Sequence, residues 1–478
     1  MSVFLSLAPA WLDTVFYIYW FVIVIMLIMD DREPSITLAW LFILLFLPFI
    51  GVFFYIFFGR DWKVVARRHG WVETLRRVET EEMAPIWERN AGASDRFRRE
   101  WAGTIAVPIK RAITNENVAT VLPATSLELF NDGAHKFRRL KEDLAGAQRF
   151  IHLQYFIWEQ DRLTAEIVPI LLDRLEAGVE VRIMYDWMGC ISFKKSELKQ
   201  LARAGAKVRA DVTDLMRINY RNHRKIAVID GCIGYFGSQN IVAPEFLKDC
   251  TNEELAARVT GPLVAQLQAV FLMDRYLETE TSLQDSDLFP EPRCVGTSPA
   301  QVLPSGPTYP NENAHEIMVA LMYGARQRIA ITTPYFIPDE PFLQAMRAAV
   351  QRGLEVHLVV SRRVDQTLVN LAQKSYYDEL LDAGVRIHLY EGHFLHAKHL
   401  SIDDCVALIG SSNMDIRSFA LNSEVIVLIY DSSVVERLRQ VQERYFAKSH
   451  LLSREEWDRR PLRAQFVQNI ARLADSFL

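Results

Sequence analysis

The chain has 478 residues, and its 54 lysines and arginines against 59 aspartates and glutamates give a formal net charge of −5. Half of the residues are hydrophobic and 24% are charged, a composition that excludes a disordered tail or a fibrous repeat. The slightly acidic balance also argues against a protein that coats nucleic acid through its overall charge. The length suggests about three domains.

Two long uncharged stretches stand near the N-terminus, at residues 14–29 and 36–58. The second is long enough, as a helix, to cross a hydrocarbon core of about 30 Å. Only the polar turn DDREPS separates them, and no Lys or Arg precedes them as a cleaved signal peptide would require. Residues 1–59 are therefore predicted to form a hairpin of two transmembrane helices.

Basic residues cluster directly after the second stretch, whereas the turn between the stretches has one. By the positive-inside rule, this asymmetry predicts a multi-pass membrane protein whose chain from residue 60 onward is cytoplasmic. The same segment would lie at anionic headgroups, with Trp62 and Trp71 as interfacial anchors. It is equally possible to interpret these basic residues as a signal for membrane topology with no further role. The basic residues are Arg60, Lys63, Arg67, Arg68, Arg76 and Arg77.

The cysteines are odd in number, widely spaced and include no CxxC pair. This pattern fits neither a disulfide framework nor a zinc knuckle, and we expect free thiols in a reducing compartment. They are Cys190, Cys232, Cys250, Cys294 and Cys405.

The rest of the chain contains an internal duplication. In the first copy AGAQRFIHLQYFIWEQD leads through a helical stretch to LEAGVEVRIMYD, and in the second YGARQRIAITTPYFIPDE leads to VQRGLEVHLVVS. Strands that alternate with helical patterns predict an α/β fold with helices on both faces of each sheet. The predicted organisation is a hairpin at 1–59, a basic juxtamembrane and linker segment at 60–115, and two repeat domains at 116–290 and 291–478.

Each copy closes with the same polar pattern, NHRKIAVIDGCIGYFGSQN in the first and LHAKHLSIDDCVALIGSSN in the second. Both contain His-x-Lys-x4-Asp, followed by a Ser and an Asn. On a strand, His and Lys at i and i+2 lie on one face. The motif residues are His223, Lys225, Asp230, Ser238 and Asn240 in the first copy, and His396, Lys398, Asp403, Ser411 and Asn413 in the second.

These residue types suit a phosphate group. Lysine supplies a fixed positive charge, asparagine supplies amide donors, and histidine supplies an imidazole that titrates near neutral pH. Two facing copies would supply the nucleophile and the general acid that phosphodiester exchange needs. The lysines and asparagines would meet the phosphoryl charge, so no metal or other cofactor is expected.

The aspartates and nearby glutamates are further candidates. We include Asp230 and Asp403 in the catalytic set as motif members, although Asp230 begins an Asp-Gly turn and is expected to cap its strand. A carboxylate is also expected at the far ring nitrogen of each histidine. Glu424, which lies 28 residues after His396, is the candidate for the second copy. For His223 the candidates are Glu253 and Glu254.

Other residues have simpler interpretations. His393, His396 and His399 could form a metal cluster, but a strand does not bring residues at i, i+3 and i+6 to one face, and the first copy has no equivalent. Several aromatic residues near the predicted strand ends are interpreted as core, rim or solvated loop. These are Tyr155-Phe156, Tyr335-Phe336 and Trp187, which precedes an FKK run that could instead line a lipid entrance.

The duplicated HxKx4D motif with GSxN resembles the phospholipase D superfamily, and the hairpin ending in FFYIFFGR resembles that of a bacterial cardiolipin synthase. The runs GSSNMDIRSFALNSE and VTGPLVAQLQAVFLMD are similar as well. The resemblance covers nearly the whole chain. It implies two tandem phospholipase D-like α-β-α sandwich domains with a shared active site at their interface. It also implies an enzyme of the bacterial inner membrane that transfers a phosphatidyl group from one phosphatidylglycerol to another and releases glycerol.

The resemblance favours His223 as the nucleophile of a covalent phosphatidyl intermediate and His396 as acid and then base. The residues alone leave these roles open, because the two copies are nearly equivalent. The sequence departs from the family at GSQNIVAPEFLKDC, where a GGxN-like run and a Glu-Tyr pair are typical, and at its DSFL ending.

Two alternative functions use the same residues. The first is a hydrolase of phospholipid or, with less support, of nucleic acid, with water as the acceptor; the hairpin and the lack of a strongly basic composition weigh against nucleic acid. The second is a lipid-binding scaffold with a relic site, which two intact motifs disfavour. The sequence leaves open the oligomeric state and the acceptor, which could be phosphatidylglycerol, phosphatidylethanolamine or a simple alcohol.

Overall fold

The computed structural model divides the chain into two compact units, residues 1–65 with 214–219 and residues 66–213 with 220–478. The predicted anchors Trp62 and Trp71 lie outside the described residues, as do Cys250, Cys294 and the predicted basic residues other than Arg77. The structure describes residues 10–29, 34–47, 51–52, 54–55, 74, 77–101, 103–104, 121–191, 194–211, 219–243, 251–279, 288–292, 296–309 and 313–475.

The first unit contains two helices where the sequence predicts a hairpin, α1 (Ala10–Met29) and α2 (Pro34–Phe46). They pack against each other through a small cluster that includes Leu27, Trp40 and Leu44. Among the residues described, no helix meets the combined length and apolarity needed to cross a membrane. The transmembrane hairpin therefore stays a prediction.

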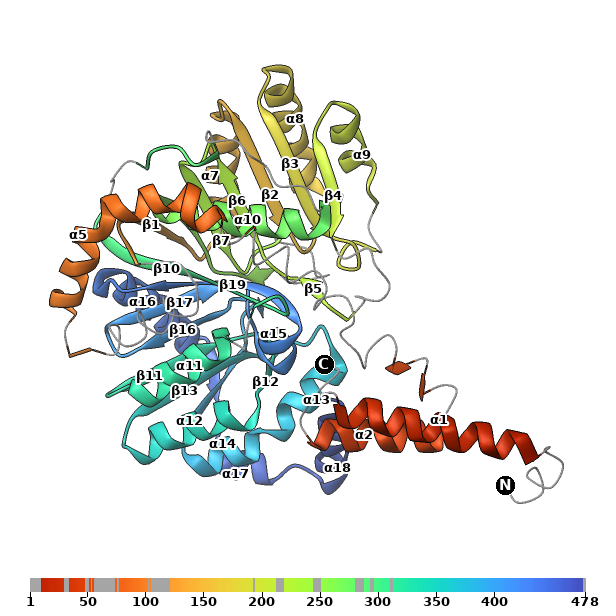
Figure 1. Cartoon of the computed structure of the whole chain (residues 1–478). Coiled ribbons are helices and arrows are strands. Elements are labelled where there is room, and N and C mark those ends of the chain that lie inside the picture. Colours follow the sequence, from red (N-terminus) through yellow and green to blue (C-terminus); the bar gives the residue numbers. More distant parts are fainter. Residues whose placement is uncertain are drawn as a thin grey trace. The chain divides into compact units, whose positions relative to one another are not determined.

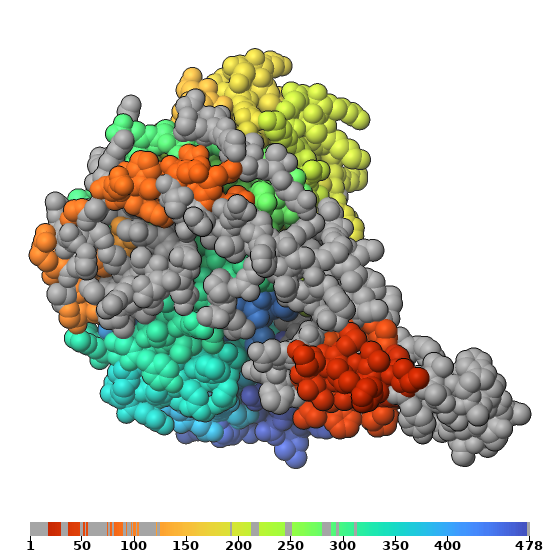
Figure 2. Space-filling model, viewed as in Figure 1, coloured from red at the N-terminus to blue at the C-terminus, as the bar shows by residue number. Residues whose placement is uncertain are grey.

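The second unit is built on one 16-stranded sheet, in which the strand order of the first repeat is mirrored by that of the second. The first repeat contributes β1-β9-β7-β6-β2-β3-β4 and the second β10-β19-β17-β16-β11-β13-β14, with β20 added at its edge. The repeats join where β1 pairs with β10 in antiparallel fashion. Figure 2 shows them at opposite ends of this unit, the first in yellow and green and the second in cyan and blue.

The strands of the first repeat are β1 (Leu122–Phe130), β2 (Phe150–Tyr155), β3 (Glu180–Asp186), β4 (Lys207–Asp211), β6 (Ile226–Ile229), β7 (Ile233–Gly237) and β9 (Ala256–Thr260). Those of the second are β10 (Ser298–Ser305), β11 (Arg328–Thr332), β13 (Glu355–Ser361), β14 (Arg386–Tyr390), β16 (His399–Ile402), β17 (Val406–Gly410), β19 (Asn422–Ile429) and β20 (Ser449–Leu451). Five short strands complete the set: β5 (Arg221–Asn222), β8 (Asn252–Glu253), β12 (Phe336–Ile337), β15 (Phe394–Leu395) and β18 (Met414–Asp415).

Helices cover both faces of the sheet, as the sequence predicts (Figure 1). In the first repeat α7 (Gly133–Ala145), α8 (Arg162–Glu176) and α9 (Ser196–Arg203) bury apolar side chains on one face. In the second, α11 (Asn313–Gly324), α12 (Glu340–Gln351), α13 (Thr367–Ser375) and α14 (Tyr377–Ala383) do the same. On the other face, α10 (Leu263–Thr279) and α16 (Ser432–Ala447) share one apolar cluster that spans both repeats. The remaining helices are η3 (Val78–Met83), α5 (Ala84–Glu100), α15 (Ile416–Ala420), α17 (Arg454–Asp458) and α18 (Leu462–Arg472).

The direction of the strands decides which end of the sheet carries the polar motifs. β2, β3 and β4 run parallel, and β6 runs antiparallel to β2. The start of β6, which follows His223 and Lys225, therefore lies beside the carboxyl ends of the parallel strands. The second repeat has the same arrangement, with β16 antiparallel to β11 and β11, β13 and β14 parallel.

Candidate active site

Each motif histidine is paired with a glutamate of the other repeat. His223 Nδ1 lies 2.8 Å from Glu424 Oε1, and His396 Nδ1 lies 2.8 Å from Glu254 Oε1. The prediction that each histidine uses a glutamate of its own repeat is therefore wrong. Glu253 is not a histidine partner in this structure, because its carboxylate accepts a hydrogen bond of 2.9 Å from the Tyr390 hydroxyl.

Two short parallel strand pairs produce this exchange. β5, which leads into the first motif, pairs with the start of β19, and β15, which leads into the second motif, pairs with β8. The His223 amide donates to the Ser423 carbonyl at 2.9 Å, and the His396 amide donates to the Glu253 carbonyl at 2.8 Å. The next residue on each partner strand is the glutamate that contacts the ring.

The serine of each motif holds the glutamate rather than a ligand. Ser238 donates to the second carboxylate oxygen of Glu254, and Ser411 donates to that of Glu424. A glycine precedes each serine because the backbones approach closely there. A Cβ on Gly237 would lie 2.5 Å from the Leu255 carbonyl oxygen. The Gly-Ser pair of each motif thus positions the glutamate: the glycine allows the close approach of the backbones, and the serine hydrogen-bonds the carboxylate.

The motif lysines lie beside their histidines, and the two motifs are within electrostatic reach of each other. Lys225 Nζ donates to the His223 carbonyl, and Lys398 Nζ donates to the His396 carbonyl at 2.6 Å. Burial lowers the pKa of both lysines, to about 8 for Lys398. Lys398 also helps to lower the pKa of His223, and Lys225 that of His396. The described residues of the two repeats thus share one site.

The electrostatics fix the protonation of the His223–Glu424 pair. Burial lowers the pKa of His223 to about 4, against the opposing effect of Glu424. Burial alone would raise the pKa of Glu424, but His223, Lys225 and Ser411 together lower it to about 2. At neutral pH the carboxylate is therefore ionised and accepts the Nδ1 proton, which leaves the lone pair on Nε2.

The second pair behaves in the same way. Burial lowers the pKa of His396, with Glu254 opposing it. The pKa of Glu254 is also below its usual value, because His396, Lys398 and Ser238 outweigh the effect of burial. Both glutamates are thus anions that hold the Nδ1 proton of the imidazole beside them.

The motif asparagines are buried close to the histidine strands. Asn240 Oδ1 accepts a hydrogen bond of 3.1 Å from the Ile157 amide, which leaves its NH2 group as the part suited to an anion. Asn413 Oδ1 has no hydrogen-bond partner among the residues described. Both side chains are buried, at 5% and 6% exposure, and their role at the motifs stays a prediction.

The motif aspartates are structural, which corrects their inclusion in the catalytic set. Asp230 accepts hydrogen bonds from the amides of Gln148, Arg149 and Phe150, at the opposite end of β6 from His223. Asp403 binds the amides of residues 326–328 in the same way. Both adopt a left-handed backbone, with φ of 53° and 49°, that suits Asp at a tight turn. They join the β-hairpin to the start of the neighbouring strand.

Arg224, which sequence reasoning did not single out, connects the first motif to the second repeat. Its Nε donates to the Glu424 carbonyl at 2.8 Å, and its Nη2 donates to the Ser305 carbonyl at 2.8 Å. Its Nη1 forms an ion pair with Asp274 on α10. The second motif has Ala397 at this position, so the two halves of the site differ here. A charged residue directly before the apolar run of β6 is the pattern that could have indicated Arg224.

Phe156, which is predicted to lie in the core or at a rim, is half-buried beside the first motif. Its ring contacts the His223 ring edge-on, at 4.8 Å between centroids, and Lys225 Nζ lies 5.3 Å from its centroid. Tyr335 lies at the corresponding edge of the second repeat, where its hydroxyl donates to Asp365. The described residues contain no group of three metal-ligand side chains.

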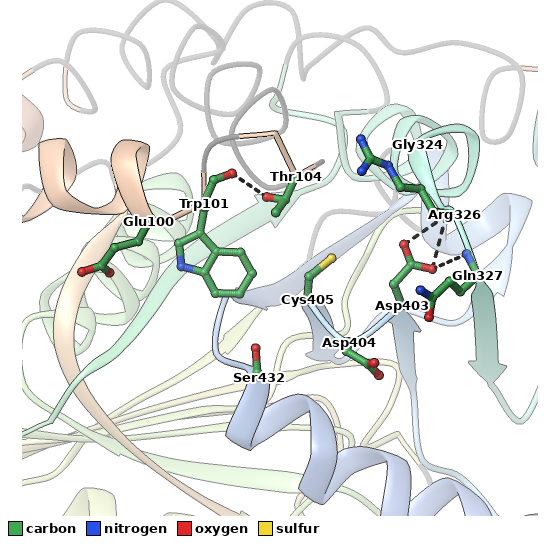
Figure 3. A pocket seen from close by; sticks show the side chains of 10 residues that line it. All are labelled: Glu100, Trp101, Thr104, Gly324, Arg326, Gln327, Asp403, Asp404, Cys405 and Ser432. Carbon is green, nitrogen blue, oxygen red and sulfur yellow. Dashed lines mark hydrogen bonds between the residues drawn. The ribbon is translucent and has the colours of Figure 1, made fainter.

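A cavity of about 390 Å³ lies away from this site, at the Asp403 end of the second repeat (Figure 3). Trp101 and Thr104 form one side of it, and the turn at Asp403 forms the other. Burial raises the pKa of the Cys405 thiol beside it to about 11, which favours the protonated thiol at neutral pH. The cavity therefore has no part in the chemistry of the motifs.

The fold and site define a class of protein in which two phospholipase D-like repeats share one pair of histidines. The family model described as "Cardiolipin synthase, PLD-like domain" matches residues 140–275 and 318–446. A second model, "Phospholipase_D-nuclease N-terminal", matches residues 15–60. A solved structure described as phosphatidylserine synthase of Haemophilus influenzae has the same fold, with a TM-score of 0.62, 16% identity, and coverage of 77% of this chain and 100% of that one.

Similar proteins named as cardiolipin synthases identify the family within this class. The chain is 33% identical to a cardiolipin synthase of Oceanobacillus iheyensis, over 94% of this chain and 95% of the relative. It is 30% identical to the major cardiolipin synthase ClsA of Bacillus subtilis, over 99% and 100%, and 30% identical to cardiolipin synthase A of Yersinia pseudotuberculosis, over 93% and 94%. The chain belongs to the cardiolipin synthase family, and the predicted resemblance is confirmed.

Proposed function

We propose that this enzyme makes cardiolipin by transferring the phosphatidyl group of one phosphatidylglycerol to a second, with release of glycerol. The observation that carries the proposal is the pair of crossed contacts, His223 with Glu424 and His396 with Glu254, in one site with two lysines. Two oriented imidazoles supply the nucleophile and the acid–base group that a two-step exchange at phosphorus needs.

In the first step His223 is the nucleophile. Its Nε2 lone pair attacks the phosphorus of the donor lipid, and the bond from phosphorus to the glycerol oxygen breaks. His396, protonated for this step, gives its Nε2 proton to the departing oxygen so that glycerol leaves neutral. The product is a phosphatidyl group joined to His223 through a nitrogen–phosphorus bond.

In the second step His396 acts as a base instead of an acid, and His223 is the leaving group. His396, now neutral, takes the proton from a hydroxyl of the second phosphatidylglycerol, and that oxygen attacks phosphorus. The bond to His223 breaks and its lone pair returns to Nε2. Cardiolipin forms, and His396 carries the proton that starts the next cycle.

The lysines and asparagines stabilise the phosphoryl oxygens in both steps. Lys225 and Lys398 supply positive charge at a buried position, where it acts more strongly than in water. The amide groups of Asn240 and Asn413 supply neutral donors. We therefore assign the catalytic set to the two histidines and two lysines, with the asparagines binding phosphate and the glutamates and serines orienting the rings.

We propose further that residues 1–59 anchor the enzyme in the bacterial membrane as a hairpin, with the two repeat domains on the cytoplasmic side. The two uncharged stretches and the match of residues 15–60 to an N-terminal family model support this anchor. The division into residues 60–115, 116–290 and 291–478 follows from the duplication, whose repeating sheets begin at β1 and β10.

The test is to supply purified protein with phosphatidylglycerol in detergent and to identify the products by mass spectrometry. Cardiolipin with an equal amount of free glycerol is the expected result. Phosphatidic acid in place of cardiolipin would identify a hydrolase, and no product would identify a binding protein. Adding phosphatidylethanolamine or a simple alcohol in competition shows which acceptor is preferred.

A further inference from the structure

The C-terminal helix α18 presents an apolar strip to solvent. Leu462, Phe466, Ile470 and Leu473 follow one another at helical spacing, and they are 82%, 66%, 50% and 84% exposed. Val467 lies beside them at 45%. Isolated apolar side chains are normal on a protein surface, but a continuous strip on one helix face marks an interaction site.

Helix α18 packs against the rest of the domain, so the exposed strip belongs to the folded structure and not to a loose C-terminal segment. α18 packs against α13 and buries Gln468 and Ala471. Beyond its end, the buried Asp475 accepts a hydrogen bond from the Tyr376 hydroxyl, and Arg472 lies 4.3 Å from the centroid of the Tyr376 ring. The face opposite α13 is therefore held outward.

Exposed apolar side chains also occur at the start of α13, the helix against which α18 packs. Val364 and Leu368, at the start of that helix, are 45% and 48% exposed. Among the described residues of this unit ten large apolar side chains are exposed, and seven of them lie on α18 or at this end of α13. Together these seven define what we call the C-terminal apolar surface.

The start of α13 borders the active site. Asp365 accepts a hydrogen bond from Tyr335, whose hydroxyl also accepts one of 3.0 Å from Gln366. Asp365 is close enough to Lys398 to raise its pKa, against the larger effect of burial. The C-terminal apolar surface thus begins beside the catalytic lysine.

Positive charge accompanies this surface. Arg363, Arg459 and Arg463 are exposed, and none of them has an ion-pair partner among the described residues. Three carboxylates near this surface are engaged by other groups: Asp365 with Tyr335, Glu379 with Arg347, and Asp458 with Arg454. Apolar side chains flanked by unpaired arginines are typical of helices that lie in the interface of an anionic membrane.

The first repeat has a smaller feature of the same kind at the corresponding place. The loop after β3 exposes Ile191 by 53%, and the exposed Lys194 follows. This loop occupies the position that residues 362–366 occupy after β13. Both edges of the active site therefore combine an exposed aliphatic side chain with positive charge.

We propose that the C-terminal apolar surface lies against an anionic lipid bilayer and seats the edge of the active site at the lipid headgroups. The proposal rests on the proposed function in one respect: an enzyme whose substrate is a membrane lipid must work near a bilayer. The contact is separate from the predicted N-terminal hairpin, because it is made by the repeat unit itself. It would fix the orientation of the site toward lipids that diffuse in the membrane.

The test is photocrosslinking of the full chain in vesicles of phosphatidylcholine and phosphatidylglycerol. The variant Phe466→p-benzoylphenylalanine is expected to form a lipid adduct that mass spectrometry detects. The matched control is Tyr323→p-benzoylphenylalanine, which replaces an aromatic residue of 49% exposure at the opposite edge of the second repeat, and no adduct is expected. Absence of a lipid adduct at 466, or an adduct to another part of the chain or to a second copy, would overturn the proposal.

A kinetic measurement gives a second readout. The double variant Leu462→Ser and Phe466→Ser is expected to lose about tenfold or more of its activity on phosphatidylglycerol in vesicles. The same variant should retain its activity on short-chain phosphatidylglycerol below its micelle concentration, and Tyr323→Ser should retain both. Equal loss on both substrates would contradict docking. If no substrate gives cardiolipin but the adduct at 466 forms, the proposed function fails and the docking surface stands.

Discussion

Glu424, in the second repeat, accepts a hydrogen bond of 2.8 Å from Nδ1 of His223, in the first. The reverse contact joins Glu254 to His396 at the same distance. Neither repeat alone therefore contains an oriented histidine, and the site exists only when both are folded together. This arrangement assigns Glu424 to the nucleophilic histidine and Glu254 to the acid–base histidine.

Removing a glutamate should impair the histidine of the other repeat. Glu424→Gln is expected to slow formation of the phosphatidyl-enzyme by at least about 100-fold, because the ring of His223 loses its orientation and the anion that stabilises it after attack. Glu254→Gln should mainly slow the proton transfers of His396. Rapid-quench detection of the labelled enzyme separates the two effects.

Glu253→Gln is the matched control for these variants, since its carboxylate contacts Tyr390 and no histidine. It should keep a rate close to that of the native enzyme. If Glu253→Gln instead reproduced the defect of Glu424→Gln, the crossed pairing would be incorrect.

The His396→Ala variant should accumulate the covalent intermediate. Without its acid–base partner, His223 can still attack an activated donor, but the second lipid is no longer deprotonated, and overall turnover falls by about 10²- to 10⁴-fold. Mass spectrometry of peptides containing residue 223 is expected to show the added phosphatidyl group. An adduct found on His396 in His223→Ala would reverse the roles of the two histidines.

The rate of enzyme labelling should fall as the pH rises above neutrality. The pKa of His223 is lowered to about 4, so the nucleophile is already neutral from about pH 5 upward and gains nothing at higher pH. The pKa of His396 is lowered from its ordinary value of 6.5. Above pH 6.5 the fraction of His396 that is protonated therefore falls by about tenfold for each pH unit. Single-turnover rates between pH 5 and 8 measure this limb. A rate that increases through pH 7 would show that the nucleophile still has a proton to lose there.

Asp230→Ala should destabilise the fold without a matching effect on chemistry. Three backbone amides lose their acceptor, and alanine is strained at a φ of 53°. The expected loss is about 1–3 kcal/mol in the free energy of unfolding, measured by thermal or denaturant unfolding. Asp230→Asn keeps an acceptor and tolerates this backbone, so it should lose less. A variant that is inactive but fully stable would return Asp230 to the catalytic set.

Chelators should leave the rate of cardiolipin formation nearly unchanged. The proposed site meets the phosphoryl charge with Lys225 and Lys398, and its two glutamates are already hydrogen-bonded to histidines. The measurement is turnover with and without EDTA, and Lys398→Met serves as the reference for loss of charge. Strong inhibition by EDTA that added Mg²⁺ reverses would contradict the metal-free mechanism.

The sequence by itself determined the local chemistry of this protein. The spacing of His223 and Lys225 predicted that the two residues act together, although the structure places both in the segment between β5 and β6 and not on a strand. The Asp-Gly turn at Asp230 identifies a strand end in any context. The duplication likewise predicted the two-fold strand order, because each copy repeats the same alternation of strands and helices. These features depend on neighbours in the chain.

Only the tertiary structure decided which groups meet across the two repeats. Glu424 follows His396 in sequence but contacts His223, because β5 pairs with β19 and carries the first motif to the second repeat. Arg224 reaches the Glu424 carbonyl for the same reason. Contacts between segments some 200 residues apart are set by sheet register and packing, and spacing along one chain does not encode which of two equivalent partners lies closer.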